Sequence, residues 1–153
     1  MPGGGEAGDE LGASVAVGDY DLDGYADVMA GSPNEDITRA GVSRVDAGAV
    51  ILFKGTSTGI SGTGSVTYSQ DTADVSGDTE SGDRLGSSVL LQDLSGYGRA
   101  DLAIGADGEN AGDGVFLQLD SGSAGISAKG ALYYGRSNLG TPAAAHLGQT
   151  LAP

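Results

Sequence analysis

The chain of 153 residues contains no cysteine and no tryptophan, and aromatic residues make up only 5% of it. Without cysteine it cannot carry a disulfide framework. With so few aromatic side chains it has little bulk for a core, whereas its 29 glycines suit a chain with many tight turns. These absences favour a fold of short elements joined by turns and without covalent cross-links.

Basic residues are also scarce, at 7 Lys and Arg against 21 Asp and Glu, which gives a formal net charge of -14. A surface of this sign repels nucleic acid and anionic membranes, so neither is expected as a partner. No apolar run approaches the roughly 18 residues of a membrane span, so membrane insertion is not expected. Because no signal peptide is recognisable, we expect that a signal was removed or that upstream sequence is missing.

The sequence also lacks the residue patterns of common catalytic sites. Its single histidine, His146, lies among small residues with no nearby acid to orient it, and no serine stands in a G-x-S-x-G context. Asp107, Glu109 and Asp113 are expected to be exposed acids of a turn. The chain is therefore predicted not to be an enzyme.

What the chain does contain is a short loop with acids at alternate positions. Its carboxylates stand at positions 1, 3, 5 and 9 of the segment 19–27, so that they can converge on one point. Gly24, at position 6, permits the sharp turn that such a loop requires. Calcium takes about six to eight oxygen ligands, so the loop is predicted to bind Ca²⁺. The predicted ligands are the side chains of Asp19, Asp21, Asp23 and Asp27 and the backbone carbonyl of Tyr25.

The sequence on both sides of this loop predicts strands. Residues 11–17 alternate with the period of a strand, and residues 28–30 form a short apolar run that ends at Gly31. An EF-hand would have flanking helices and a glutamate at position 12, where this chain has Ala30. The site is therefore predicted as strand, calcium loop, strand, and the alternative is an acidic, solvated hairpin turn.

The same segment returns 74 residues later and marks an internal repeat. Residues 85–91 match residues 11–17, and a third start at 147–151 follows. In the second half of each unit the offset falls to 66, which places an insertion within residues 34–48 of the first copy. Four strands in a unit of about 60 to 70 residues is the size of a propeller blade. The expected strands are 11–18, 26–31, 48–54 and 64–69 in the first unit and 85–92, 100–105, 114–119 and 130–135 in the second.

The second copy of the loop has lost two of the four carboxylates. Ser95 and Tyr97 stand where the first copy has Asp21 and Asp23. Because affinity for a hard dication follows the charge of its ligands, this loop is expected to be vacant or weakly filled. Its remaining candidate ligands are Asp93, Ser95, the carbonyl of Arg99 and Asp101. The Arg99 side chain is an alternative cation for the two carboxylates.

Three features together resemble an FG-GAP repeat, the blade unit of the integrin alpha-subunit propeller and of many secreted bacterial proteins. They are Leu11-Gly12, the acidic loop 19–27 and the run 30–33, and the similarity extends from about residue 9 to the end of the chain. The resemblance implies that the loop joins the first two strands of a blade and binds calcium through the five ligands named above. It also implies an extracellular, secreted protein of bacterial origin.

We therefore expect an all-β partial β-propeller of two four-stranded FG-GAP-like blades and one extra strand. The expected division is a flexible tail at 1–8, a first blade with its linker at 9–84, a second blade at 85–146 and the first strand of a third repeat at 147–153. Because two blades are too few to close a ring, we expect self-association or association with missing blades.

The predicted function is that of a calcium-binding extracellular module for binding or adhesion, similar to the integrin alpha propeller. Ca²⁺ is the expected cofactor, and an unidentified protein or glycan is the expected ligand. One alternative is a structural scaffold, either a fragment of a longer propeller or a chain that assembles with its own copies. Another is a part of a secreted hydrolase, with or without catalytic residues.

Overall fold

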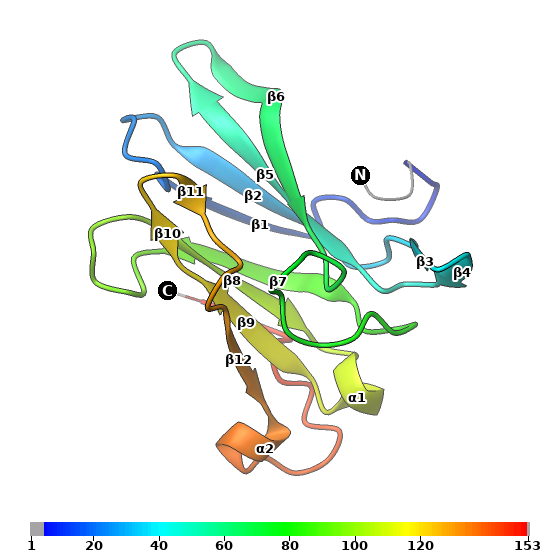
Figure 1. Ribbon diagram of the computed structural model, residues 1–153. Coiled ribbons are helices and arrows are strands. Elements are labelled where there is room, and N and C mark those ends of the chain that lie inside the picture. The colour runs from blue at the N-terminus through cyan, green and yellow to red at the C-terminus, as the bar shows by residue number, and fades with distance from the viewer. Residues whose placement is uncertain (1–4, 153) are drawn as a thin grey trace.

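Two four-stranded antiparallel sheets make up the frame of this computed structural model, which describes residues 5–152 (Figure 1). The first sheet has the order β1-β2-β5-β6 and the second has the order β12-β9-β8-β7, so each consists of one copy of the repeat. The all-β prediction of two propeller-like blades is therefore confirmed. The bounds are β1 Ser14–Gly18, β2 Asp27–Ser32, β5 Ala49–Thr56 and β6 Gly59–Tyr68 in the first sheet and β7 Leu85–Gln92, β8 Asp101–Ala106, β9 Val115–Leu119 and β12 Leu132–Gly135 in the second.

Short elements fill the connections. The insertion in the first copy forms a two-stranded hairpin, and a second small hairpin follows β9. One distorted helical turn lies between β8 and β9, and another follows β12. No helix among residues 5–152 has the length and apolar character to span a membrane. These elements are β3 Ile37–Arg39, β4 Val42–Arg44, α1 Glu109–Gly112, β10 Ser121–Gly122, β11 Gly125–Ile126 and α2 Arg136–Leu139.

Two strand starts differ from the sequence prediction by three residues or more, and the other strand ends differ by two residues or fewer. The first strand begins at Ser14 and not at residue 11, because Glu10 and Gly12 have φ angles of 57° and 89°, which interrupt an extended chain. The fourth strand begins at Gly59 and not at residue 64, because its first residues pair with the end of β5 across a tight turn. In that pairing Thr56 is opposite Gly59.

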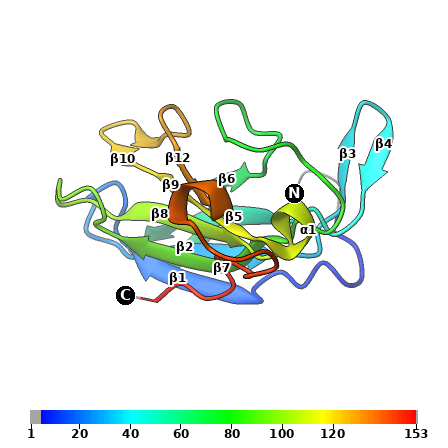
Figure 2. The same ribbon diagram turned by 90° about the horizontal axis from the view of Figure 1, so that it is seen from below.

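The core lies between the two sheets, which lie against each other in Figure 2. Alternate side chains of the first sheet, including Ala16 and Met29, face Leu91 and Leu102 of the second. Close approach depends on glycine, since a Cβ added to Gly31 would lie 2.1 Å from the carbonyl oxygen of Gly86. The first sheet therefore buries one of its faces against the second.

The opposite face of the first sheet is uncovered along β1. Val15 and Val17 are 57% and 58% exposed, whereas Val89 and Leu91, at the same positions of the second copy, are 6% and 5% exposed. The second copy has the first sheet beside it, and the first copy has no sheet on that side among residues 5–152. The repeat thus places equivalent apolar residues in two different environments.

The connection that starts the second blade is repeated at residue 147. Leu85 forms an isolated parallel bridge with Gly48, and Leu147 forms the same bridge with Gly114. The segment expected as the first strand of a third repeat forms this bridge but no strand, because the described residues offer it no second strand to pair with. Leu151 then lies in a groove that β1 and β7 line.

A serine hydroxyl fastens each of these connections. Ser14 Oγ donates to the carbonyl oxygen of Gly86 at 2.7 Å, and Ser88 Oγ donates to that of Gly148 at 2.5 Å. The segment after residue 146 therefore docks on the second sheet as the second sheet docks on the first.

The N-terminal segment makes defined contacts where it is described. Of the tail expected at residues 1–8, the first four residues lie outside the described part of the chain. Farther along, the N–H of Glu6 donates to Asp9 Oδ2 at 2.6 Å, and Asn34 Nδ2 donates to the carbonyl of Gly8 at 3.2 Å.

Candidate metal centre

The acidic loop joins the first two strands of the first sheet, as the sequence predicts. Gly18 and Asp27 are opposite each other at the end of the β1–β2 ladder, so the residues between them form the hairpin connection. Its turn requires positive φ angles at Leu22 (59°) and Gly24 (87°). The glycine adopts such an angle at little cost, which agrees with the role expected for position 6.

Carboxylates inside the loop accept hydrogen bonds from its own backbone. Asp19 Oδ2 accepts the N–H of Gly24 at 3.0 Å, and Asp23 Oδ1 accepts the N–H of Tyr25 at 2.9 Å. Asp21 Oδ1 accepts the N–H of Asp23 at 3.2 Å. These bonds fold the chain around the acids and use only part of the lone pairs of each carboxylate.

Three of the four predicted side chains converge. One oxygen from each of Asp19, Asp21 and Asp27 lies within 4.8 Å of the other two. The Oδ1 atom of Asp19 is buried and has no hydrogen-bond partner, which is costly for a charged oxygen. Calcium prefers oxygen ligands, and a dication would satisfy this atom and offset the repulsion among the three charges. The residues present therefore fit a calcium ion.

Asp27 has a structural role as well. It is fully buried, its Oδ2 accepts the N–H of Tyr20 at 3.1 Å, and its Oδ1 accepts the N–H of Gly55 at 2.8 Å. Burial raises the pKa of Asp27, although both hydrogen bonds act in the opposite direction. The carboxylate ties the hairpin loop to β5, whether or not an ion is bound.

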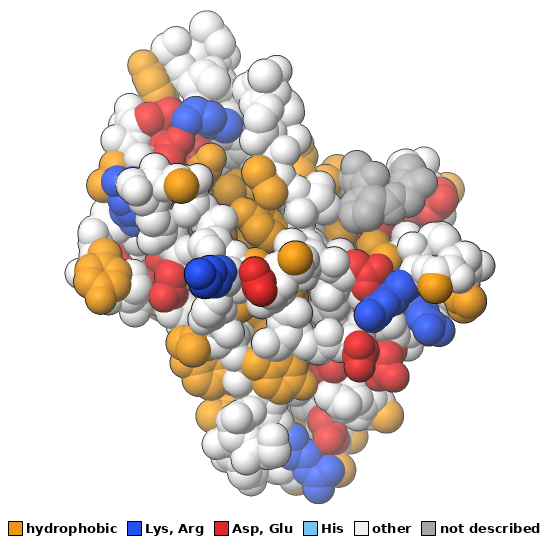
Figure 3. Space-filling view, in the orientation of Figure 1, with side chains coloured by type: hydrophobic (Ala, Val, Ile, Leu, Met, Phe, Trp, Pro, Cys, Tyr) orange, Lys and Arg blue, Asp and Glu red, His pale blue; other side chains and the backbone are white. Residues whose placement is uncertain are grey.

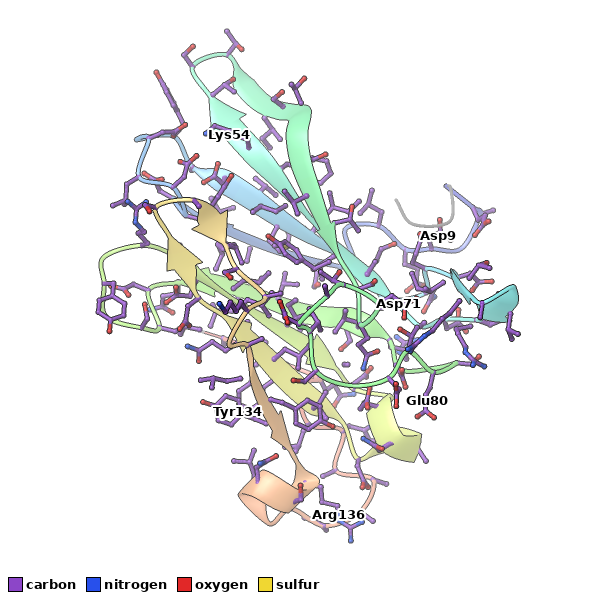
Figure 4. All side chains as sticks on the ribbon, in the orientation of Figure 1. Asp9, Lys54, Asp71, Glu80, Tyr134 and Arg136 are labelled. Atoms are coloured by element: carbon purple, nitrogen blue, oxygen red, sulfur yellow. The ribbon has the colours of Figure 1, made fainter. Side chains whose placement is uncertain are left out.

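Asp23 lies apart from the converging group and faces a lysine. Lys54 Nζ, at the end of β5, lies 3.2 Å from Asp23 Oδ2 and also contacts Asp21 Oδ2. The N–H of Tyr25, followed by Lys54, holds the pKa of Asp23 below its usual value against the effect of burial. Figure 4 shows Lys54 on β5 beside the β1–β2 loop, and Figure 3 shows a basic side chain against acidic ones in that part of the surface.

Sequence reasoning missed Lys54, since the lysine is 33 residues from Asp21 and belongs to another strand. Tyr25 is tied into the loop by its backbone N–H, which donates to Asp23, and its side chain is 44% exposed.

In the second loop both carboxylates accept hydrogen bonds from backbone N–H groups, without an ion. Asp93 accepts the N–H groups of Gly96 and Gly98 at 2.7 and 2.9 Å. Asp101 is fully buried and accepts N–H groups of Leu94 at 2.9 Å and Ser121 at 2.7 Å.

Ser95 and Arg99 complete the predicted set in this loop. The N–H of Ser95 donates to Asp101 at 2.7 Å, and among residues 5–152 Arg99 forms no ion pair. Burial acts to raise the pKa of Asp101, but the hydrogen bonds from Ser121 and Ser95 outweigh it, so the pKa is lowered. The second loop therefore has two satisfied carboxylates where the first has three converging ones.

A buried glutamate follows the second strand of each blade, Glu35 after β2 and Glu109 after β8. Glu35 is fully buried, and neither of its carboxylate oxygens has a hydrogen-bond partner. Burial, and then the charges of Asp9 and Glu6, raise the pKa of Glu35 to about 7. Figure 4 shows Asp9 in the N-terminal segment.

In the second copy the equivalent glutamate has partners. Glu109 Oε2 accepts Gln70 Nε2 at 2.5 Å and its Oε1 accepts Asn110 Nδ2 at 3.1 Å. The expectation that Glu109 is exposed was wrong, since it is 3% exposed, because it lies beneath the linker that carries Gln70. Glu35 and Glu109 are separated by 74 residues, which is the offset of the repeat. A glutamate that recurs at the same position of both copies is the sequence signal that could have indicated a shared structural role.

Comparison with known families identifies the segment that carries the loop. Residues 11–53 match the FG-GAP repeat model. This segment is similar to an FG-GAP repeat. It contains β1, the acidic loop, β2 and most of β5, and Lys54 is the first residue beyond it. No curated protein matches the chain. The match supports a β-propeller-type module.

Proposed function

We propose that this chain is a calcium-binding extracellular module of the β-propeller type that acts in binding or adhesion. The observation that carries the proposal is the convergence of Asp19, Asp21 and Asp27 around the buried, unpartnered oxygen of Asp19. The calcium ion supplies positive charge that holds the loop together. Asp19, Asp21 and Asp27, with the Tyr25 carbonyl, are its ligands, and Asp23 completes the set when its side chain leaves Lys54.

A calcium titration tests this function. Isothermal titration calorimetry with CaCl₂ is expected to count one strong ion for each chain, and Asp19→Asn is expected to remove it because a neutral amide replaces one ligand charge. Asp93→Asn is the matched control at the same position of the second loop and is expected to leave binding unchanged. Absence of calcium binding by the unmodified chain would refute the proposal.

Calcium is also expected to stabilise the fold. At a calcium concentration about 100 times Kd, binding to the folded state alone adds about 2.7 kcal/mol, or about 5 to 11 °C in Tm for a domain of this size. Equal melting curves in chelator and in calcium would contradict a structural ion.

A structural role in a larger propeller is the second candidate. It is supported by the exposed valines of β1 and by the blade connection that recurs at Leu147. Light scattering of the chain tests it: self-association is expected, and a monomer that persists at all concentrations would leave only missing blades as partners.

A further inference from the structure

Lys54 lies on β5 beside the acidic loop and contacts two of its carboxylates. Its Nζ contacts the carboxylates of Asp21 and Asp23, and the next residue, Gly55, donates its N–H to Asp27. The side chains of this cluster are only partly exposed, at 37% for Lys54 and 21% for Asp21. Charges in such a setting interact more strongly than on an open surface, because water screens them less.

The second repeat shows what happens where the acids are absent. The offset of 66 residues places Asp120 at the position of Lys54, and both Gly55 and Ser121 donate their N–H groups to the last acid of their loop, which confirms that alignment. The loop that lacks two carboxylates therefore also lacks the lysine and carries an acid instead. Asp120 accepts Gln118 Nε2 at 2.9 Å and so bonds outside its loop. In the first copy this position carries a cation, Lys54, opposite in charge to the acidic loop. In the second copy it carries an acid, Asp120, which has the same charge as the acids of its loop.

We propose that Lys54 is an internal competitor of calcium. In the calcium-free loop its ammonium group neutralises Asp21 and Asp23 and keeps the loop folded. When calcium binds, the ammonium leaves these carboxylates, so that Lys54 lowers calcium affinity and limits binding to calcium-rich surroundings. This inference rests on the proposed calcium site, and it concerns how that site is tuned.

Two electrostatic effects determine how removal of the ammonium group should change loop stability and calcium affinity. The loop without an ion would hold like charges close together, and a tethered cation removes that repulsion at a small entropic cost, because β5 fixes its backbone. A bound dication would repel the ammonium and compete for the same oxygens. Removing the ammonium should therefore destabilise the calcium-free loop and strengthen calcium binding.

The variant Lys54→Met tests both effects, calcium affinity by calorimetry and stability of the calcium-free chain by its Tm. This variant keeps a similar apolar stem and removes the charge, and it is expected to bind calcium about tenfold more tightly at low ionic strength, a gain that shrinks in high salt. Its Tm in chelator is expected to be lower than that of the unmodified chain. Lys54→Arg, which keeps the charge, should bind calcium as the unmodified chain does. Lys129→Met, at the only other lysine and an exposed one, is the matched control.

A second measurement needs no variant. Acylation of the two lysines by an amine-reactive reagent, followed by mass spectrometry, is expected to be slow at Lys54 in chelator and to approach the rate of Lys129 in calcium. An unchanged rate at Lys54 when calcium binds, or equal or weaker calcium binding by Lys54→Met, would overturn the inference and leave the calcium site intact. If neither the unmodified chain nor Lys54→Met binds calcium, the calcium site itself fails.

Discussion

The loop after β1 and the loop after β7 hold their last acid in the same way and their other acids differently. Asp27 and Asp101 are both fully buried, and each accepts a backbone N–H from its own loop and another from a distant segment. The distant donor is Gly55, near the end of β5, for Asp27 and Ser121, just after β9, for Asp101. In the first loop Asp19 and Asp21 converge with Asp27, whereas in the second Asp93 has both oxygens bonded to the backbone. The last acid therefore has a structural role in both loops, and only in the first do earlier acids converge with it.

This difference shows that the second copy keeps the fold of the hairpin without two of the carboxylates that the first copy has. Replacing two carboxylates by Ser95 and Tyr97 removes charge from the ligand positions but leaves Asp101 in place. Because Asp101 fixes the hairpin to Ser121, just after the third strand, the loop keeps its course without a cation. The comparison therefore predicts that structural and ion-binding acids respond to different changes.

Removal of the last acid is expected to have the largest effect. Asp101→Ala leaves three buried or half-buried backbone N–H groups unpaired, which is expected to lower the free energy of unfolding by about 3 kcal/mol. Asp27→Ala should cost a similar amount in chelator. Urea unfolding measures both, with Asp93→Ala, at an exposed acid, as the milder control. A much smaller loss of unfolding free energy for Asp27→Ala than for Asp101→Ala would show that the two acids do not have the same structural role.

Restoring the lost carboxylates is expected to create a second ion site. Ser95→Asp with Tyr97→Asp returns the charges that the first loop has, so calorimetry should count two calcium ions for each chain in place of one. At calcium about 100 times the new Kd, the added stability is about 2.7 kcal/mol. The neutral pair Ser95→Asn with Tyr97→Asn is the control. A count that stays at one would show that the shape of the second loop, and not its charge, prevents binding.

The parts that the sequence predicts well are those that depend on neighbours along the chain. The alternation in residues 14–17 and the phasing of acids around Gly24 are local, and the structure has the strands and the turn where they are expected. The internal repeat extends this knowledge to the second blade, where β7 has the predicted bounds of 85–92.

The parts that the sequence does not predict depend on contacts between distant segments. Lys54 reaches the acidic loop only because β5 pairs with β2, and Glu109 is buried only because the linker with Gln70 folds over it. Both contacts join residues more than 30 positions apart, at separations of 33 and 39. Such pairing requires the sheet order, which single-sequence patterns do not contain.

The buried glutamates extend the comparison to pH. The pKa of Glu35 is raised to about 7 by burial and by Asp9 and Glu6, so the folded chain keeps a proton that the unfolded chain loses near the usual glutamate pKa of 4.5. The free energy of unfolding should therefore fall as pH rises from about 4.5 to 7 and then level off. Glu35→Gln removes this fall and is expected to gain about 2 kcal/mol at pH 8 relative to pH 4.

Thermal melting at several pH values checks this expectation. Glu109→Gln should give a smaller gain at pH 8 than Glu35→Gln, because burial raises the pKa of Glu109 but the hydrogen bond from Gln70 acts in the opposite direction. Glu10→Gln, at an exposed acid, is the control for a change of net charge. A pH profile of Glu35→Gln that parallels the unmodified chain would show that Glu35 is ionised at no cost.

The smallest expected effect concerns the two serines that fasten successive blades. Ser14→Ala removes a hydrogen bond between the two sheets and is expected to lower the free energy of unfolding by about 1 kcal/mol. Ser88→Ala removes the equivalent bond to Gly148, but that bond holds only the segment after residue 146. Its loss should leave the unfolding midpoint unchanged and speed hydrogen exchange at residues 147–151, because a short segment can open without the sheets. Ser65→Ala, at an exposed serine, is the control. Equal losses of global stability for Ser14→Ala and Ser88→Ala would mean that the C-terminal segment is as much a part of the cooperative fold as the contact between the blades.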